Sequence, residues 1–377
     1  MNARGFSLVE LLIALTVTAL IVGAVAGVLP AARAAFDATP GVVDLQQRSR
    51  LVADVLSSSL RGAGGHTVAE SGGAPLSSVL PVILPLPSSG GSAEAFSAVV
   101  VTSAVPGGGQ GVLERDQTGP AGALTLATAR SCPHVEDVCG FRPGAVAAIV
   151  DGRGRYDVFV VASTNASFAR IVPAMPLSTA YLADAALVEI ESTRFALAAQ
   201  ADGSSALVKQ TADGPTQPIV DGVSQLSFDV WAIAEAPILR GDDGAAWASY
   251  GPAAPPATSV EPSGTWPAGE SCVVARDESG PRSRLVSLGD AGSLVRLPPS
   301  ALEDGPWCPG AAGVPRFDAD AFRVRRLDIT FRVEVLSAVL RGPAGRLFAR
   351  GGLASHAPIR WVPDRVVALS VAVRSVP

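Results

Sequence analysis

Glu10 is the residue with the most informative chemistry in this sequence, because it lies inside an apolar run. The run covers residues 6–29, and the other members of its 24 positions are apolar or small. A carboxylate at the centre of a membrane-spanning helix costs about 2.5–3.5 kcal/mol on insertion, and less near an end. Glu10 therefore requires a cationic partner if the run crosses a bilayer.

A cationic partner arises if the leader MNARG is removed after Gly5. Phe6 then becomes a positively charged N-terminus, and Glu10 lies one helical turn from it. The amine of the same chain or of a neighbouring chain neutralises the carboxylate, and an acidic side chain in the first turn also suits the helix dipole. Gly5 fits a cleavage point because a residue without a side chain is easily held extended in a protease cleft.

The apolar run is long enough to cross a bilayer, since 24 helical residues cover ~36 Å against a hydrocarbon core of ~30 Å. A secretory signal peptide is the alternative, because residues 31–35 (AARAA) have signal-peptidase spacing, but its apolar region usually has only ~7–15 residues. Arg4 before the run and only Arg33 after it orient the N-terminus toward the cytoplasm. Everything after residue 36 is then exported.

The stretch RGFSLVELLIAL, residues 4–15, resembles the class III signal of type IV pilins and type II secretion pseudopilins. In that family a prepilin peptidase cleaves after the glycine and methylates the new amine, and the glutamate pairs with a neighbouring subunit's N-terminus during filament assembly. The resemblance implies cleavage after Gly5, N-methylation of Phe6 and an assembly role for Glu10. The alternative is a membrane anchor in which Glu10 reaches toward the membrane surface.

Two further stretches resemble the same family. Residues 46–65, QQRSRLVADVLSSSLRGAGG, resemble the helix end of PilW-type minor pilins and J-type pseudopilins, and residues 187–231 resemble their body more loosely. The W-type resemblance is preferred. It implies an α+β fold in which a long N-terminal helix, transmembrane in its first half, packs on an antiparallel sheet.

Four cysteines, Cys132, Cys139, Cys272 and Cys308, fall in the exported part, where an oxidising compartment favours disulfides. Of the three possible pairings, the most local joins Cys132 to Cys139 and Cys272 to Cys308, for which loop entropy gives ~2.5 and ~4 kcal/mol. A metal site is the alternative for residues 132–139, CPHVEDVC. Its spacing matches no common zinc pattern, so the sequence predicts no metal.

The other polar residues favour a structural protein over an enzyme. The three histidines are outside any recognisable nucleophile motif, and the sequence has neither a phosphate-binding glycine loop nor a His-Glu-x-x-His pair. Glu189 and Glu191 point to one side of a predicted strand, which fits solvated positions better than acid–base catalysis. No cofactor is predicted, and a tethered hydrolase is the weaker alternative.

Composition and charge set the class of the chain. Its 377 residues are 48% hydrophobic and 17% charged, which excludes a disordered protein. The net charge of −5 conceals a basic C-terminal segment, residues 316–377, with 11 Arg against 5 acidic residues. This Arg-rich segment predicts either contact with nucleic acid or an acidic partner, or arginines on the solvent face of strands, and the overall acidity favours the second.

The elements that carry these residues follow from periodicity. After the span, Thr39 and Pro40 are typical of a helix start, Pro30 of a kink, and Gly62 of a helix end. The apolar residues of this helix approximate one stripe that should pack on a sheet: Val42, Leu45, Val52, Val55, Leu56 and Leu60.

From residue 63 the pattern becomes that of strands. Hairpins are predicted around the turns at 151–154 and 202–203, and alternation over 327–335 and 367–373 predicts two strands that each bury one face. Residues 241–271 have little periodicity and much Pro, Gly and Ala, which predicts a loop insertion.

The sequence thus predicts an α+β type IV pilin-like protein in four parts: a leader (1–5), a transmembrane helix (6–29), its amphipathic continuation (30–62) and an exported β-rich region (63–377). Its predicted role is that of a non-catalytic minor pilin that helps initiate or cap a filament and waits in the bacterial inner membrane with its body in the periplasm. The predicted partners are prepilin peptidase and other pilins or pseudopilins. The alternatives are a type II secretion pseudopilin, and a pilus-tip adhesin or DNA-binding subunit that uses the Arg-rich segment.

Overall fold

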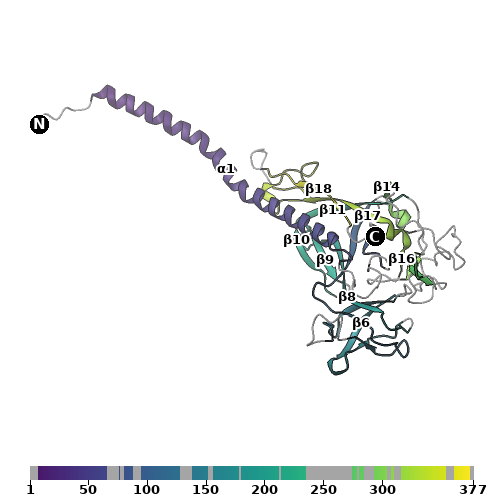
Figure 1. The fold of residues 1–377 in the computed structure, drawn as a ribbon. Helices are drawn as coiled ribbons and strands as arrows, with labels where there is room; N and C mark the ends of the chain where they lie inside the picture. The colour runs from purple at the N-terminus through teal and green to yellow at the C-terminus, as the bar shows by residue number, and fades with distance from the viewer. Residues whose placement is uncertain are drawn as a thin grey trace.

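The chain forms a long helix attached to a β-rich body, and the N-terminal end of the helix lies far from the body (Figure 1). The structure, a computed structural model, describes residues 7–65, 76, 80–87, 95–127, 138–151, 156–177, 180–211, 214–234, 274–277, 280–283, 293–303, 307–309, 316–353 and 361–373. The predicted leader and the predicted loop insertion at 241–271 lie outside these residues.

The helix, α1, runs without interruption from Leu8 to Arg61, 54 residues in all. The prediction that a new helical segment begins at Pro40, capped by Thr39, is wrong. A proline removes one backbone donor, and the flanking turns here keep their own hydrogen bonds and continue through it. Gly62 follows as the C-cap, and its N–H donates to the carbonyls of Leu60 and Ser58.

One side of the second half of α1 packs on the sheet. Leu45, Val52, Leu56 and Leu60 are buried and belong to the main hydrophobic core together with strands from across the body. Val42 departs from the predicted stripe, since 39% of its surface is exposed. The first buried residue of the predicted stripe is therefore Leu45, and Val55, further along the stripe, is only partly buried.

The described part of the body contains one 14-stranded sheet and two short two-stranded sheets. The strands of the large sheet are β1 (Ile83–Pro87), β2 (Phe96–Ala104), β3 (Gln110–Val112), β4 (Leu124–Thr125), β5 (Val146–Val150), β6 (Tyr156–Asn165), β7 (Arg170–Pro173), β8 (Ala186–Ala199), β9 (Ser205–Thr211), β10 (Gln217–Asp221), β11 (Val223–Ile233), β14 (Leu294–Leu297), β17 (Val324–Val333) and β18 (Arg365–Ala372). The short sheets pair β12 (Val274–Asp277) with β13 (Gly280–Ser283) and β15 (Trp307–Pro309) with β16 (Arg316–Asp318). Short 3₁₀ turns are η1 (Ala166–Phe168), η2 (Pro299–Leu302), η3 (Ala319–Arg323) and η4 (Ala338–Leu340).

The main path through the large sheet is β18-β17-β11-β2-β8-β5-β6-β7-β4, and its strand pairs are antiparallel. Strand β11 lies between β17 and β2, so segments separated by about a hundred residues or more along the chain meet at the centre. Phe228 of β11 lies opposite Ile329 of β17 on one side and Phe96 of β2 on the other. The predicted α+β class, a long helix packed on an antiparallel sheet, is confirmed.

The predicted hairpins and alternating strands are also present. Strands β5 and β6, which flank the predicted turn, pair with each other, and β8 and β9 pair across Asp202 and Gly203. Strand β17 alternates buried and half-buried residues along its length, as the sequence pattern predicted. Strand β18 pairs with β17 over its whole length.

The long strand β8 connects two hydrophobic cores. Its C-terminal half pairs with β2 and β9 above the main core, and its N-terminal half pairs with β3 and β5. A second core gathers there around Phe141, Phe159 and Tyr181. The body is therefore enlarged by a β-rich extension that shares a strand with the main sheet.

Asp202 closes the β8–β9 hairpin and provides a first testable prediction. Its carboxylate accepts hydrogen bonds from the hydroxyl of Ser204 at 2.5 Å and from the N–H of Ser204 at 2.8 Å. These bonds, the hydroxyl first, hold the pKa of Asp202 below its ordinary value of 3.8. We expect Ser204→Ala to raise the pKa of Asp202 toward that value, as measured by the pH titration of the carboxyl carbon in NMR spectra.

The sign of the linked stability change follows from the depressed pKa. The stability that the hydrogen-bonded carboxylate contributes is fully present above the pKa that Asp202 has in the unfolded chain. It is lost as the pH falls through the lower pKa that Asp202 has in the folded chain. Ser205→Ala, which leaves both bonds to Asp202 in place, is the matched control. An unchanged Asp202 titration in Ser204→Ala would contradict the assignment.

Candidate functional site

Glu10 lies in the first turn of α1, where it forms a capping box with Ser7. The N–H of Ser7 donates to Oε2 of Glu10 at 3.0 Å, and the N–H of Glu10 donates to Oγ of Ser7 at 3.3 Å. The carboxylate thus satisfies a backbone donor that the helix itself leaves unpaired. The sequence reasoning missed this role, although Ser-x-x-Glu before an apolar run is a recognised sequence signal for it.

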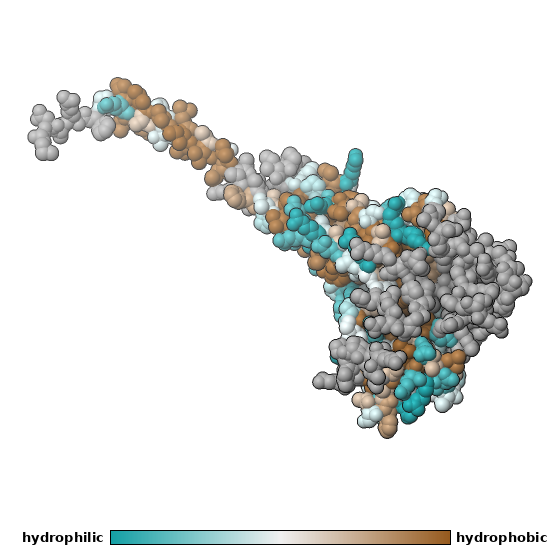
Figure 2. All heavy atoms as spheres, viewed as in Figure 1, coloured by the Kyte–Doolittle hydropathy of each residue, from teal (hydrophilic) through white to brown (hydrophobic). Residues whose placement is uncertain are grey.

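The first 22 residues of α1, Leu8–Leu29, have a mean hydropathy of 2.6, and none of these residues is buried inside the chain. Figure 2 shows this segment as a hydrophobic rod that projects from the body. By length and composition it is able to cross a membrane. An exposed apolar surface of this size requires a membrane or a protein partner.

Glu10 is the charged side chain of this segment. The two threonines satisfy their hydroxyls within the helix: Thr16 donates to the carbonyl of Ile13 at 2.9 Å and Thr18 to the carbonyl of Ala14 at 2.7 Å. Both are compatible with an apolar medium because they carry no unpaired donor. The capping bonds leave the negative charge of Glu10 without a cation among the described residues.

Two of the predicted site residues, Gly5 and Phe6, lie outside the described residues. The register of the helix nevertheless begins immediately after them, since Ser7 is the N-cap and Leu8 the first helical residue. A new N-terminus at Phe6 would therefore be one residue before the cap. It would be close in sequence to the Glu10 carboxylate that the cap already turns back toward the chain start.

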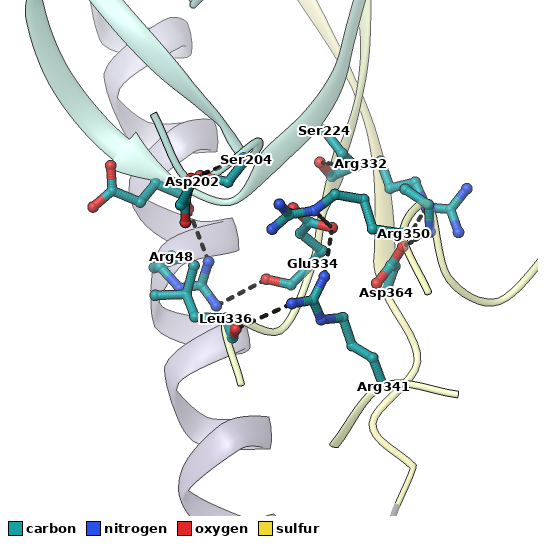
Figure 3. A network of polar contacts seen from close by, with 12 residues as sticks. Arg48, Asp202, Ser204, Ser224, Arg332, Glu334, Leu336, Arg341, Arg350 and Asp364 are labelled. Carbon is teal, nitrogen blue, oxygen red and sulfur yellow. Dashed lines mark hydrogen bonds and ion pairs between the residues drawn. The ribbon is translucent and has the colours of Figure 1, made fainter. Parts of the chain in front are cut away.

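Arg48 fastens the second half of α1 to the body (Figure 3). Its guanidinium donates to the carbonyl of Asp221 at 2.8 Å and to the carbonyl of Glu334 at 3.0 Å, and it pairs with Asp44 at 2.7 Å. Gly222 permits this approach: its φ is +71°, and a Cβ there would lie 2.6 Å from the guanidinium. Arg48 was not predicted, although a charge at helical spacing from Leu45 and Val52 signals a paired group at the packing surface.

A second set of charges braces the chain after β17. The side chain of Glu334 is fully buried, and its carboxylate pairs with Arg350 at 2.8 Å and with Arg341 at 3.7 Å. Arg332 donates to the carboxylate of Asp364 at 2.8 Å. Together with Arg48, these groups hold α1, β17 and the start of β18 in one arrangement (Figure 3).

These contacts explain much of the Arg-rich segment. Arg323 is buried and donates to the carbonyls of Ile233 and Ala234, and Arg326 lies over the ring of Trp231 at 4.4 Å. Burial lowers the pKa of Arg325 to about 10. Within the described part of the segment, polar or ring contacts inside the chain are made by the side chains of Arg323, Arg325, Arg326, Arg332, Arg341 and Arg350. Arg326 and Arg332 lie at half-buried positions of β17 that alternate with its core residues, so they are on the outer face as predicted, and they also make contacts within the chain.

The cysteines are only partly described. Cys139 is fully buried in the second core and is disulfide-bonded. Cys132 and Cys272 lie outside the described residues, and Cys308 is placed in β15 by its backbone alone. The pairing of Cys132 with Cys139 and of Cys272 with Cys308 therefore stays a prediction.

The acidic pair considered for catalysis has structural contacts. Glu189 accepts a hydrogen bond from the N–H of Gly109 at 2.7 Å, and Glu191 pairs with Lys209 at 3.3 Å. In the described part of the chain, His, Cys, Asp and Glu side chains nowhere gather in groups of three or more. The arrangement that stands out chemically is therefore the apolar rod with its single carboxylate.

Comparison with known proteins gives one finding, and it falls on this rod. No curated protein and no solved structure matches the chain. Residues 1–26, which contain Glu10 and most of the exposed apolar segment, match the family model of the prokaryotic N-terminal methylation motif.

Proposed function

We propose that this chain is a type IV pilin-like filament subunit whose leader is removed after Gly5 and whose new N-terminus, Phe6, is methylated. The observation that carries the proposal is the exposed apolar rod with a carboxylate in its first turn, within residues that match the N-terminal methylation motif. Prepilin peptidase is the processing partner that the motif implies.

Glu10 changes partner in the proposed assembly step. In the precursor its carboxylate accepts from the neutral N–H of Ser7. Cleavage creates a positively charged amine at Phe6, and a charge-assisted hydrogen bond is roughly twice as strong as a neutral one. When that amine belongs to a neighbouring subunit, the pair forms only in the filament. The cost of a lone carboxylate in the bilayer then favours leaving the membrane for the filament.

The minor-subunit role, with a single inner-membrane pass and a periplasmic body before assembly, extends the same proposal. The β-rich extension on β8 enlarges the body beyond what packing against α1 requires, which fits a subunit that begins or caps a filament. A pseudopilin of a type II secretion system has the same helix and processing. The DNA-binding alternative loses support because much of the Arg-rich segment contacts the chain itself.

The mass of the mature chain tests this proposal. We expect the protein purified from cells with its prepilin peptidase to lack residues 1–5 and to carry one added methyl group on Phe6. Intact-mass measurement and N-terminal peptide sequencing read both changes, and cells without the peptidase provide the control. A mature chain that begins near residue 36 would instead establish a secretory signal peptide and contradict the proposal.

A further inference from the structure

Strand β18 lies at one end of the main path through the large sheet, and no described strand pairs with its outer edge. It is eight residues long, and among the described residues it pairs only with β17. Its sequence, RVVALSVA, has one charge, at Arg365, and no proline. A long edge strand without such protection offers its backbone to another strand.

The other strands with a single partner in this sheet are short or carry proline. Strands β3 and β4 have three and two residues, and β14 has four with a central arginine. Strand β1 contains Pro85 and Pro87, and β10 contains Pro218 beside a register shift. These other edge strands are thus protected from further pairing by their short length, by proline or by a charged residue, and β18 departs from that pattern.

The hydrogen-bond register identifies the open groups of β18. The N–H of Val373 donates to the carbonyl of Arg325, and Ala372 lies opposite Arg326. Because directions alternate along an antiparallel strand, Val367, Leu369 and Val371 direct their N–H and carbonyl groups to β17. The outward-directed backbone groups belong to Val366, Ala368, Ser370 and Ala372.

The edge is held in place before any partner arrives. Asp364, next to the strand, accepts hydrogen bonds from Arg332 at 2.8 Å and from the N–H of Ala349 at 2.6 Å (Figure 3). Val371 is 1% exposed and belongs to the core cluster that includes Leu45 of α1. A prearranged strand loses little conformational freedom on pairing, which favours binding.

We propose that β18 receives an extended strand from a neighbouring, different filament subunit. Four outward pairs of donors and acceptors at a two-residue repeat match an extended peptide, whereas a helix or lipid leaves them unpaired. The membrane segment is also separated from the body, because α1 rises ~14 Å over the 9 residues between Leu29 and Ala38, which packs against the core cluster. This inference rests on the proposed function, since it requires the chain to enter a filament.

Residue-resolved hydrogen exchange of the full chain tests the proposal. We expect the amides of Val366, Ala368, Ser370 and Ala372 to exchange at least about tenfold more slowly in isolated filaments than in the detergent-solubilised chain. The inward amide of Leu369 is the internal control, protected in both states. Incorporation into filaments without added protection would overturn strand addition and leave the proposed function standing.

A matched pair of variants makes the test independent of that measurement. Ala368→Pro removes one outward N–H and no bond to β17, whereas Ala368→Val keeps it. We expect Ala368→Pro to lower filament incorporation at least tenfold with an unchanged thermal melt, and Ala368→Val to incorporate normally. Equal incorporation of the two variants would overturn the proposal. If the outward amides of the purified chain alone became protected as its concentration rose, the edge would pair with a second copy, and this too would overturn the proposal. Absence of the native chain from filaments would instead contradict the proposed function.

Discussion

Glu10→Ala should remain in the membrane and fail to enter filaments, with at least a tenfold drop in the ratio of filament to membrane protein. The carboxylate costs about 2.5–3.5 kcal/mol at the centre of a bilayer, and less near its edge. Its removal stabilises the membrane-held chain and at the same time deletes the ion pair that the filament offers. Quantitative immunoblots of sheared filaments and of membranes measure the ratio.

Glu10→Gln separates the charge from the capping box. Its amide oxygen still accepts the Ser7 N–H, so the helix start is retained, but no ion pair forms. We expect Glu10→Gln to fail like Glu10→Ala, and Ser7→Ala, which loses the cap and keeps the charge, to assemble. Normal assembly of Glu10→Gln would show that Glu10 serves only as a helix cap.

The proposed amine partner makes the effects of Glu10 and Gly5 variants non-additive. Gly5→Leu should block leader removal, so the amine at Phe6 never forms. Adding Glu10→Ala to Gly5→Leu should then lower filament incorporation no further, because both changes remove the same ion pair. A clear additional loss in the double variant would indicate that the carboxylate has another partner.

Glu334→Ala should lower the free energy of unfolding by about 3–5 kcal/mol, the range for breaking a buried ion pair from one side. The Arg341 side chain is only 8% exposed and would keep its charge without the carboxylate. The total free energy of unfolding of a small domain is about 5–15 kcal/mol, so a loss of this size would bring the protein close to unfolding. Urea titration of the full chain in detergent, followed by tryptophan fluorescence, measures it.

Arg350→Ala is the matched control for Glu334→Ala. Its side chain is 29% exposed, and the carboxylate keeps Arg341 after the change. We expect a smaller loss than for Glu334→Ala, because the buried carboxylate keeps the charge of Arg341 and the deleted guanidinium is partly solvated. Equal midpoints for Glu334→Ala and the native chain would contradict a brace that depends on this buried carboxylate.

Local signals in the sequence were sufficient for the long helix and for the strand pairs that follow a turn signal. The helix with Glu10 in its first turn and the β8–β9 hairpin at Asp202 and Gly203 are encoded by neighbouring residues, and the structure has both. The helix break at Pro40 was wrong because neighbouring turns outweigh one missing donor.

Long-range features were not accessible in the same way. Strand order depends on contacts between distant segments, such as Phe96 with Phe228, which no local period specifies. The hydrogen bonds of Arg48 likewise depend on the carbonyl groups of Asp221 and Glu334, which are distant from Arg48 in the sequence. Sequence charge alone therefore placed the arginines of this segment on the solvent face of strands, and it could not show that most of the described ones also contact groups of the same chain.

The uninterrupted helix α1 fixes the rotational orientation of the body about the helix axis. Helix α1 is continuous between the membrane segment and Arg48, so the number of residues there sets which side of the body faces each neighbour. One inserted residue would turn the body by about 100° around the helix axis and raise it by about 1.5 Å. The strand edge at β18 would then point away from its partner even though every contact inside the chain was unchanged.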